Sequence, residues 1–166
     1  MESVTGRGDG RGTPRGFRLR AWRPADRAAC LDVFESNVPR WFRRHERIEF
    51  AAFLDALPGP FLVVEATGGP VVACGGWARR PDTAIADLCW DMVARPLHGE
   101  GLGRLLVEER LRRIRLAGNV REVALNTSQH TVGFYETFGF VVERVEPDGY
   151  APGLDRCDMR LVLAPA

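Results

Sequence analysis

Three apolar segments rich in β-forming residues follow one another with only short breaks between them. They cover residues 61–66, 71–79 and 83–93, and the breaks at 67–70 and 80–82 contain the Gly, Pro and Asp residues typical of turns. Links this short join antiparallel neighbours, because a parallel crossover needs a dozen or more residues. The middle of the chain is therefore predicted to be an antiparallel three-stranded meander.

Helical and strand patterns flank this meander on both sides. The expected strands are at 17–22, 121–126, 140–145 and 156–163, and the expected helices at 24–36, 45–57, 101–116 and 130–138. The helix at 101–116 carries apolar or small residues every three or four positions, so one of its sides is predicted to pack on a sheet. This order predicts an α+β fold with a mixed, mostly antiparallel central sheet flanked by helices.

The first 15 residues differ in composition from the rest of the chain. They are rich in Gly and Arg and nearly free of apolar side chains, so they cannot bury enough surface to offset the entropy lost on ordering. We expect a disordered tail over residues 1–15 and a single domain over 16–166. A domain of this size buries about two-thirds of its unfolded surface and needs no disulfide or metal to fold.

Composition excludes several classes of protein. All 23 basic residues are arginine, so a Walker A loop and a Schiff-base mechanism, which both need lysine, are ruled out. A net charge of +1 argues against a nucleic-acid or membrane partner. The Cys and His residues are too scattered to predict a metal site. With no apolar run of membrane-spanning length and no secretory signal, a cytoplasmic location is expected.

A glycine-rich loop joins the last meander strand to the long helix. It reads Gly99-x-Gly101-x-Gly103. Glycines let a backbone approach an anion closely, and the first amides of a helix have no partner within the helix, so this loop is predicted to hold a phosphate group. Arg104 stands where the dinucleotide-binding motif Gly-x-Gly-x-x-Gly requires its third glycine, which argues against a Rossmann site.

Two motifs in this chain resemble those of the GCN5-related N-acetyltransferases. The first is His98-x-x-Gly101-x-Gly103, which resembles the family's Gln/Arg-x-x-Gly-x-Gly/Ala signature. The second is Tyr135-x-x-x-Gly139-Phe140, which looks like the family's Tyr-x-x-x-Gly-Phe block. The resemblance covers about residues 16–163 and departs from the family at His98. It implies the family's fold and acetyl-coenzyme A (acetyl-CoA) as the acetyl donor.

The resemblance also implies which residues bind the cofactor. Pantetheine is expected along the end of the strand, and pyrophosphate on the backbone amides of the loop, while Asn126 or Ser128 could hydrogen-bond either part or simply cap a turn. The cofactor-binding residues implied in this way are Met92, Val93, Ala94, His98, Gly99, Glu100, Gly101, Leu102, Gly103, Arg104, Asn126 and Ser128.

Tyr135 is the catalytic residue that the resemblance implies. A phenol near the sulfur can protonate the leaving coenzyme A thiolate. An amine acceptor must in turn lose a proton, and Asp87 and Asp91 are the candidate bases, with a structural role for both left open. Alternation of side chains along the strand at 83–93 predicts that these two aspartates share one face.

The function that these features predict is transfer of an acetyl group to a primary amine of a small molecule, by direct attack in a ternary complex. The variable segment 37–45, which is aromatic and basic, is expected to choose the acceptor. Two alternatives stay open: a protein or peptide N-acetyltransferase, and a non-catalytic acyl-CoA-binding sensor. A homodimer is also left open.

Overall fold

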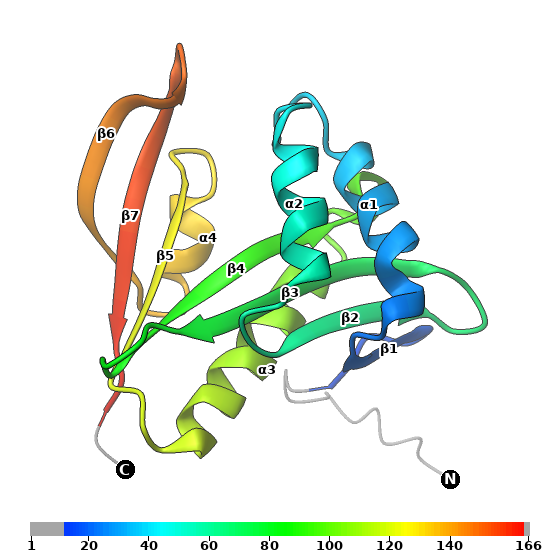
Figure 1. Ribbon diagram of the computed structural model, residues 1–166, viewed down its shortest axis with the longest axis horizontal. Coiled ribbons are helices and arrows are strands. Elements are labelled where there is room, and N and C mark those ends of the chain that lie inside the picture. The colour runs from blue at the N-terminus through cyan, green and yellow to red at the C-terminus, as the bar shows by residue number, and fades with distance from the viewer. Residues whose placement is uncertain (1–11, 165–166) are drawn as a thin grey trace, which may run out of the picture. The chain divides into compact units, whose positions relative to one another are not determined.

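The computed structural model describes residues 12–164 and contains a single seven-stranded sheet (Figure 1). The strands are β1 (Phe17–Ala21), β2 (Phe61–Ala66), β3 (Val71–Arg79), β4 (Ile85–Val93), β5 (Glu122–Ser128), β6 (Val141–Ala151) and β7 (Leu154–Val162). The tail predicted over residues 1–15 falls mostly on residues 1–11, which lie outside the described part of the chain.

The strands follow the order β1-β2-β3-β4-β5-β7-β6. Strands β1 and β2 are antiparallel, as are β5 and β7 and then β7 and β6, whereas β4 and β5 run parallel with Ile85 opposite Glu122. The helices are α1 (Arg27–Ser36), α2 (Glu46–Asp55), α3 (Leu102–Ala117) and α4 (Val132–Glu136), with 3₁₀ turns η1 (Pro24–Asp26) and η2 (Arg95–Leu97). The predicted α+β fold, a mostly antiparallel sheet flanked by helices, is confirmed.

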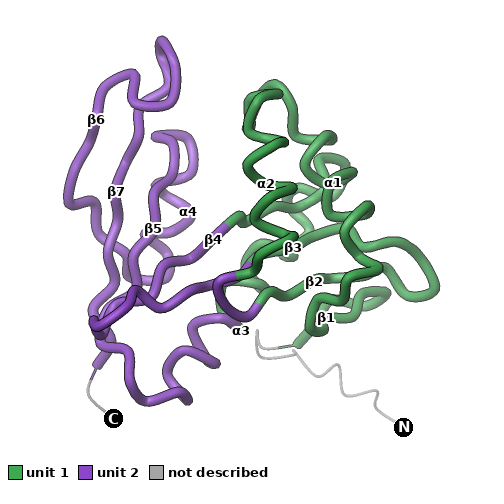
Figure 2. The backbone as a smooth tube through the Cα atoms, viewed as in Figure 1, with its two compact units in different colours: residues 1–57, 61–75, 90–109 green, residues 58–60, 76–89, 110–166 purple. Residues whose placement is uncertain are grey.

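The described residues group into two compact units (Figure 2). The first takes the described residues up to Leu57 together with Phe61–Gly75 and Trp90–Glu109. The second takes Pro58–Pro60, Gly76–Cys89 and the described residues from Arg110 onward. The prediction of one domain over residues 16–166 stays a prediction.

An aromatic cluster forms the core of the first unit, where α1 and α2 lie side by side (Figure 1). Phe34 of α1 and Phe50 of α2 are fully buried, and their ring centroids are 5.8 Å apart. The Trp90 ring of β4 lies 4.9 Å from that of Phe50. Aromatic pairs at such distances add stabilisation beyond the area they bury. This cluster fixes α1 and α2 on the end of β4.

In the second unit, β6 and β7 are longer than the sequence predicts. The strands expected at 140–145 and 156–163 leave the residues between them unassigned. The structure shows an irregularity between Glu146 and Ala151, with Asp148 at φ +54°. The Asp148 amide donates to Asp155 Oδ1 at 2.9 Å, so the two strands stay joined beyond this point. The unassigned stretch is therefore a bulge within a longer hairpin.

A buried ion-pair network ties β1 to η1 in the first unit. Arg20 donates two hydrogen bonds to Asp26, at 2.7 and 2.8 Å, and one to Glu65 at 2.7 Å. Asp26 also accepts the Arg23 amide at 2.7 Å. The hydrogen bonds from Arg20 lower the pKa of Asp26 below its ordinary value of 3.8. The ionised carboxylate therefore stabilises the fold.

Replacing Asp26 by Asn is expected to lower the free energy of unfolding by about 2 kcal/mol at pH 7, because Arg20 loses one of its two ionic partners, the buried one. A lowered folded-state pKa means that the contribution is complete above the unfolded pKa and is lost as pH falls through the folded one. The difference between wild type and Asp26→Asn should therefore shrink in acid. Urea unfolding at pH 7 and at about pH 3 measures both effects.

The matched control is Asp55→Asn, which removes an exposed partner of Arg27. Exposed pairs contribute little, so a smaller loss is expected there. Equal losses in the two variants, or an Asp26→Asn loss that does not change with pH, would contradict the role assigned to the network.

Within the described residues, no helix combines the length and the apolar character needed to span a membrane.

Candidate functional site

The loop between β4 and α3 has a backbone that only glycine adopts readily. Gly99 has φ +87° and Gly101 has φ +81°, both in the left-handed region. A Cβ added at either position would meet no atom within 4 Å, so backbone conformation and not crowding requires glycine. The space beside both residues is open to a ligand.

Several amides of this loop donate no hydrogen bond to any described residue. They belong to Gly99, Gly101, Leu102 and Gly103. The Glu100 amide differs, because it donates to the Leu97 carbonyl at 3.3 Å. Amides without an internal partner at the positive end of a 16-residue helix form a site for a phosphate or similar anion. The loop backbone thus has the unpartnered amides that an anion cradle requires, apart from that of Glu100, and binding of the cofactor there stays a prediction.

The end of β4 is fastened to α1 by side chains. Asn37, at the C-terminal end of α1, is 2% exposed, and its Nδ2 donates to the Val93 carbonyl at 2.9 Å. The Arg95 amide donates to Ser36 Oγ at 3.1 Å, and the Ala94 amide to the Val72 carbonyl at 2.7 Å. These bonds hold the strand end in one position. A rigid strand end can hold a bound thioester in a fixed orientation for reaction.

The side chain of His98 forms a hydrogen bond within the protein in this structure. Its Nε2 lies 2.8 Å from the Val93 carbonyl, which can only accept, so this nitrogen carries the proton. The ring also meets the edge of Trp41 at a centroid distance of 5.9 Å, and the His98 amide donates to Arg95. The expected contact of His98 with the cofactor stays a prediction, and the observed contacts make it a residue that positions the loop.

The backbone of β4 is irregular at one position between the two candidate bases, where Trp90 has φ +52°, a left-handed value. Burial still alternates along the strand, since Leu88 and Met92 are buried while both candidate bases are partly buried. That Asp87 and Asp91 share one face stays a prediction. Met92 is buried in the aromatic core. Side-chain burial makes Met92 available to a ligand only through its backbone.

Asp87 is committed to an ion pair. Its carboxylate accepts two hydrogen bonds from Arg80, at 2.8 and 2.7 Å, and thereby raises the pKa of Arg80. Both carboxylate oxygens of Asp87 are thus occupied by one guanidinium. Asp91 is half-buried and its Oδ1 is inaccessible to solvent.

Tyr135 is held in the second unit by aromatic packing. It lies on α4, is 7% exposed, and meets the rings of Phe134 and Phe140 edge-on at 5.0 and 5.9 Å. This packing fixes the direction of the phenol. The role of Tyr135 as a proton donor stays a prediction.

Asn126 and Ser128 lie on β5 and have local partners. Asn126 Oδ1 accepts a hydrogen bond from the Tyr150 hydroxyl at 2.6 Å. The Ser128 carbonyl accepts the Thr131 amide at 3.1 Å, so this residue closes the turn before α4. Cofactor binding by either side chain stays a prediction.

One contact of the candidate site could not be predicted from sequence. Asn37 was expected only as part of the segment 37–45, and its partner Val93 is 56 residues away along the chain. An Asn directly before Val38-Pro39, where a helix ends, is a signal that could have drawn attention to Asn37.

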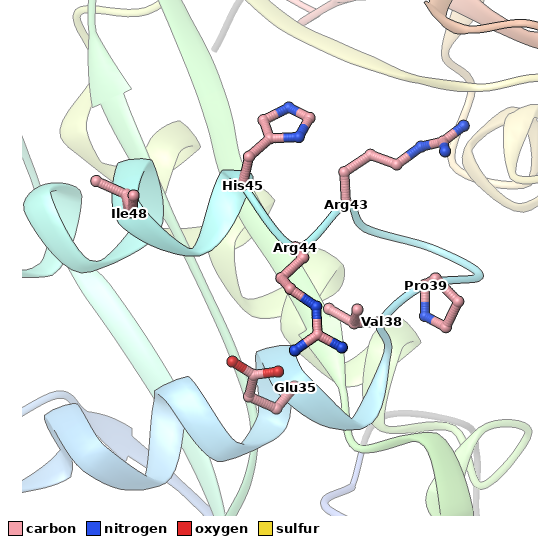
Figure 3. A pocket seen from close by; sticks show the side chains of 7 residues that line it. All are labelled: Glu35, Val38, Pro39, Arg43, Arg44, His45 and Ile48. Atoms are coloured by element: carbon pink, nitrogen blue, oxygen red, sulfur yellow. The ribbon is translucent and has the colours of Figure 1, made fainter.

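A hollow of about 710 Å³ opens between the end of α1 and the start of α2, inside the first unit (Figure 3). It is lined by Glu35, Val38, Pro39, Arg43, Arg44, His45 and Ile48. Figure 3 shows Glu35 on α1, Ile48 on α2, and most of the other side chains on the connecting segment. This segment is the one that the sequence predicts to choose the acceptor. Its first residue, Asn37, contacts the end of β4.

Comparison with known proteins identifies the class to which this fold and cradle belong. A structure of an acetyltransferase of the GNAT family from Desulfovibrio desulfuricans superposes with a TM-score of 0.77 at 28% identity, covering 89% of this chain and 99% of the other. The acetyltransferase yncA from Salmonella typhimurium, solved with acetyl-CoA, gives 0.72 at 20% identity, covering 90% and 95%. The ribosomal-protein-S18-alanine N-acetyltransferase from Escherichia coli gives 0.76 at 18% identity, covering 90% and 96%.

The sequence model of the acetyltransferase (GNAT) domain family matches residues 37–163. The chain therefore belongs to this family, which confirms the resemblance. It is an N-acetyltransferase, and acetyl-CoA is its co-substrate. The unpartnered amides and open glycine backbone at 99–103 fit the pyrophosphate of that co-substrate. No curated protein matches the sequence.

Proposed function

We propose that this enzyme transfers an acetyl group from acetyl-CoA to a primary amine of a small molecule, by direct attack in a ternary complex. The observation that carries the proposal is the hollow at 35–48, which begins beside the residue that holds the end of β4. A hollow of this volume lies within the range of small-ligand sites.

Each part of the chain has a distinct role in this proposal. The amides of Gly99, Gly101, Leu102 and Gly103 hold the pyrophosphate, and the backbone of Met92–Ala94 runs along the pantetheine. Asn37 and His98 keep the strand end in place, so that the amide near Val93 can polarise the thioester carbonyl. Tyr135 gives a proton to the departing thiolate.

Asp91 is the better of the two candidate bases. Asp87 is bonded twice to Arg80, whereas Asp91 lies in the first unit, on the same strand end as Met92 and Val93. An amine that arrives as an ammonium ion must lose a proton before it attacks, directly or through a water molecule. We therefore assign this step to Asp91.

Replacing Asp91 by Asn is expected to lower kcat/KM at pH 7 by about 100-fold, the range typical of a general base. The loss should become smaller at high pH, where free amine is more abundant. Asp87→Asn is the matched control on the same strand and should change kcat/KM by less than about threefold, because it removes only a structural ion pair. Steady-state rates across pH 6–10 for the two variants measure the difference. A larger loss in Asp87→Asn would contradict the assignment.

Direct attack can be tested by two-substrate kinetics. Initial rates measured while acetyl-CoA and amine are both varied should give intersecting reciprocal plots. Parallel plots, together with an acetylated enzyme in intact-protein mass spectrometry, would indicate a covalent route instead. Cys89 is the one cysteine in the described chain that is not buried, so a Cys89→Ala variant is the control for that route. Under direct attack this variant keeps its activity.

A further inference from the structure

The hollow at 35–48 has an excess of positive charge. Arg43 and Arg44 both line it, and neither guanidinium forms an ion pair or hydrogen bond with any described residue. Glu35 is the single carboxylate among the lining residues, and it is already paired with Arg47 at 2.7 Å. Glu46, the next carboxylate along the chain, accepts the Arg43 backbone amide at 2.5 Å. Two arginines are thus left free to bind an anion at this hollow.

The backbone amides at the start of α2 are already hydrogen-bonded and do not bind such an anion. The Glu46, Arg47 and Ile48 amides donate to the carbonyls of the three residues before the helix, at 3.0 to 3.3 Å. An anion in the hollow must therefore be held by side chains. Arginine suits this task, because its planar guanidinium can donate two parallel hydrogen bonds to one carboxylate.

Apart from His45, the rest of the lining is apolar. Val38 and Pro39 follow Asn37 directly, and Ile48 exposes 76% of its surface although it is aliphatic. An acceptor with a short hydrocarbon body can cover these groups. The guanidinium groups repel an ammonium ion, so a molecule with both charges is oriented with its amine away from the arginines.

From these observations we infer that the acceptor is a primary amine that also carries a carboxylate, as in an amino acid, and that Arg43 and Arg44 bind that carboxylate. The inference rests on the proposed function and deepens it. It makes Arg43 and Arg44 the specificity-determining residues, and it predicts discrimination against polyamines and against neutral amines of the same size.

The test compares acceptors that differ only in charge. Each of several amino acids is paired with its own carboxamide, spermidine is added as a purely cationic amine, and kcat/KM is measured at saturating acetyl-CoA. We expect the best amino acid to exceed its carboxamide by about 30-fold, in line with loss of a charge-assisted hydrogen bond. In the Arg43→Gln/Arg44→Gln variant the preference should fall below about threefold.

Arg115→Gln is the matched control, because it removes one positive charge from the last turn of α3, outside the hollow. It should keep the full preference, and all variants should bind acetyl-CoA with unchanged Kd. If amines are acetylated without a preference for the carboxylate, or if the double variant keeps the preference, the inference is overturned while the proposed function stands. If acetyl-CoA binds but no small amine in the panel is acetylated, the proposed function fails, and the inference with it.

Discussion

Replacing Tyr135 by Phe is expected to lower kcat by at least about 100-fold, the effect typical of losing a general acid. The substitution removes one oxygen atom and leaves the ring contacts with Phe134 and Phe140 in place. Folding and the affinity for acetyl-CoA should therefore change little. Without the phenol, the departing thiolate must take its proton from water, and the barrier rises.

The measurement is kcat at saturating substrates, together with the Kd of acetyl-CoA from calorimetry. Tyr150→Phe is the matched control, since it removes the chain's other phenol, which donates to Asn126. Its kcat should stay within about threefold of wild type, the effect of losing one exposed hydrogen bond. If Tyr150→Phe loses activity and Tyr135→Phe keeps it, the roles of the two phenols are reversed.

Replacing Gly101 by Val should weaken acetyl-CoA binding by about 100-fold, because a β-branched residue strains the left-handed backbone and turns the loop amides away from the anion. Gly101 has φ +81° and precedes the unpartnered amides of Leu102 and Gly103. No neighbouring atom blocks a side chain there, so the effect comes from the backbone alone. Calorimetric titration with coenzyme A measures it directly.

The control for this prediction is Gly118→Val. Gly118 has φ +71° just beyond the C-terminal end of α3 and is equally free of neighbouring atoms. Both variants should lose thermal stability to a similar extent, but only Gly101→Val should lose affinity. Equal affinities in the two variants would show that the cradle does not bind the co-substrate.

Local patterns allowed much of the fold to be predicted from sequence. Short turns and alternating apolar residues gave the meander, and the three- and four-residue spacing of apolar side chains gave α3. The glycine loop was recognisable because three glycines at alternate positions around the start of a helix are typical of a backbone that closely approaches an anion. Each of these signals lies within about 15 residues of sequence, the range over which periodicity is informative.

The unpredicted features depend on contacts between distant residues. The bond from Asn37 to Val93 and the contact between Trp41 and His98 each span more than 50 positions, and no local pattern encodes them. The left-handed backbone at Trp90, whose ring packs with that of Phe50, is also not encoded by any local pattern. The sequence motif suggests that His98 binds the cofactor, whereas its observed contacts are with Val93 and Trp41.

The proposed function is the acetylation of small amines with acetyl-CoA. Mass spectrometry of products, after incubation with acetyl-CoA and a mixture of small primary amines and short peptides, tests it most directly. We expect at least one small amine heavier by one acetyl group, with a yield that falls sharply in Tyr135→Phe. Acetylation of peptides alone, or acetyl-CoA binding without any acetylated amine, would contradict it.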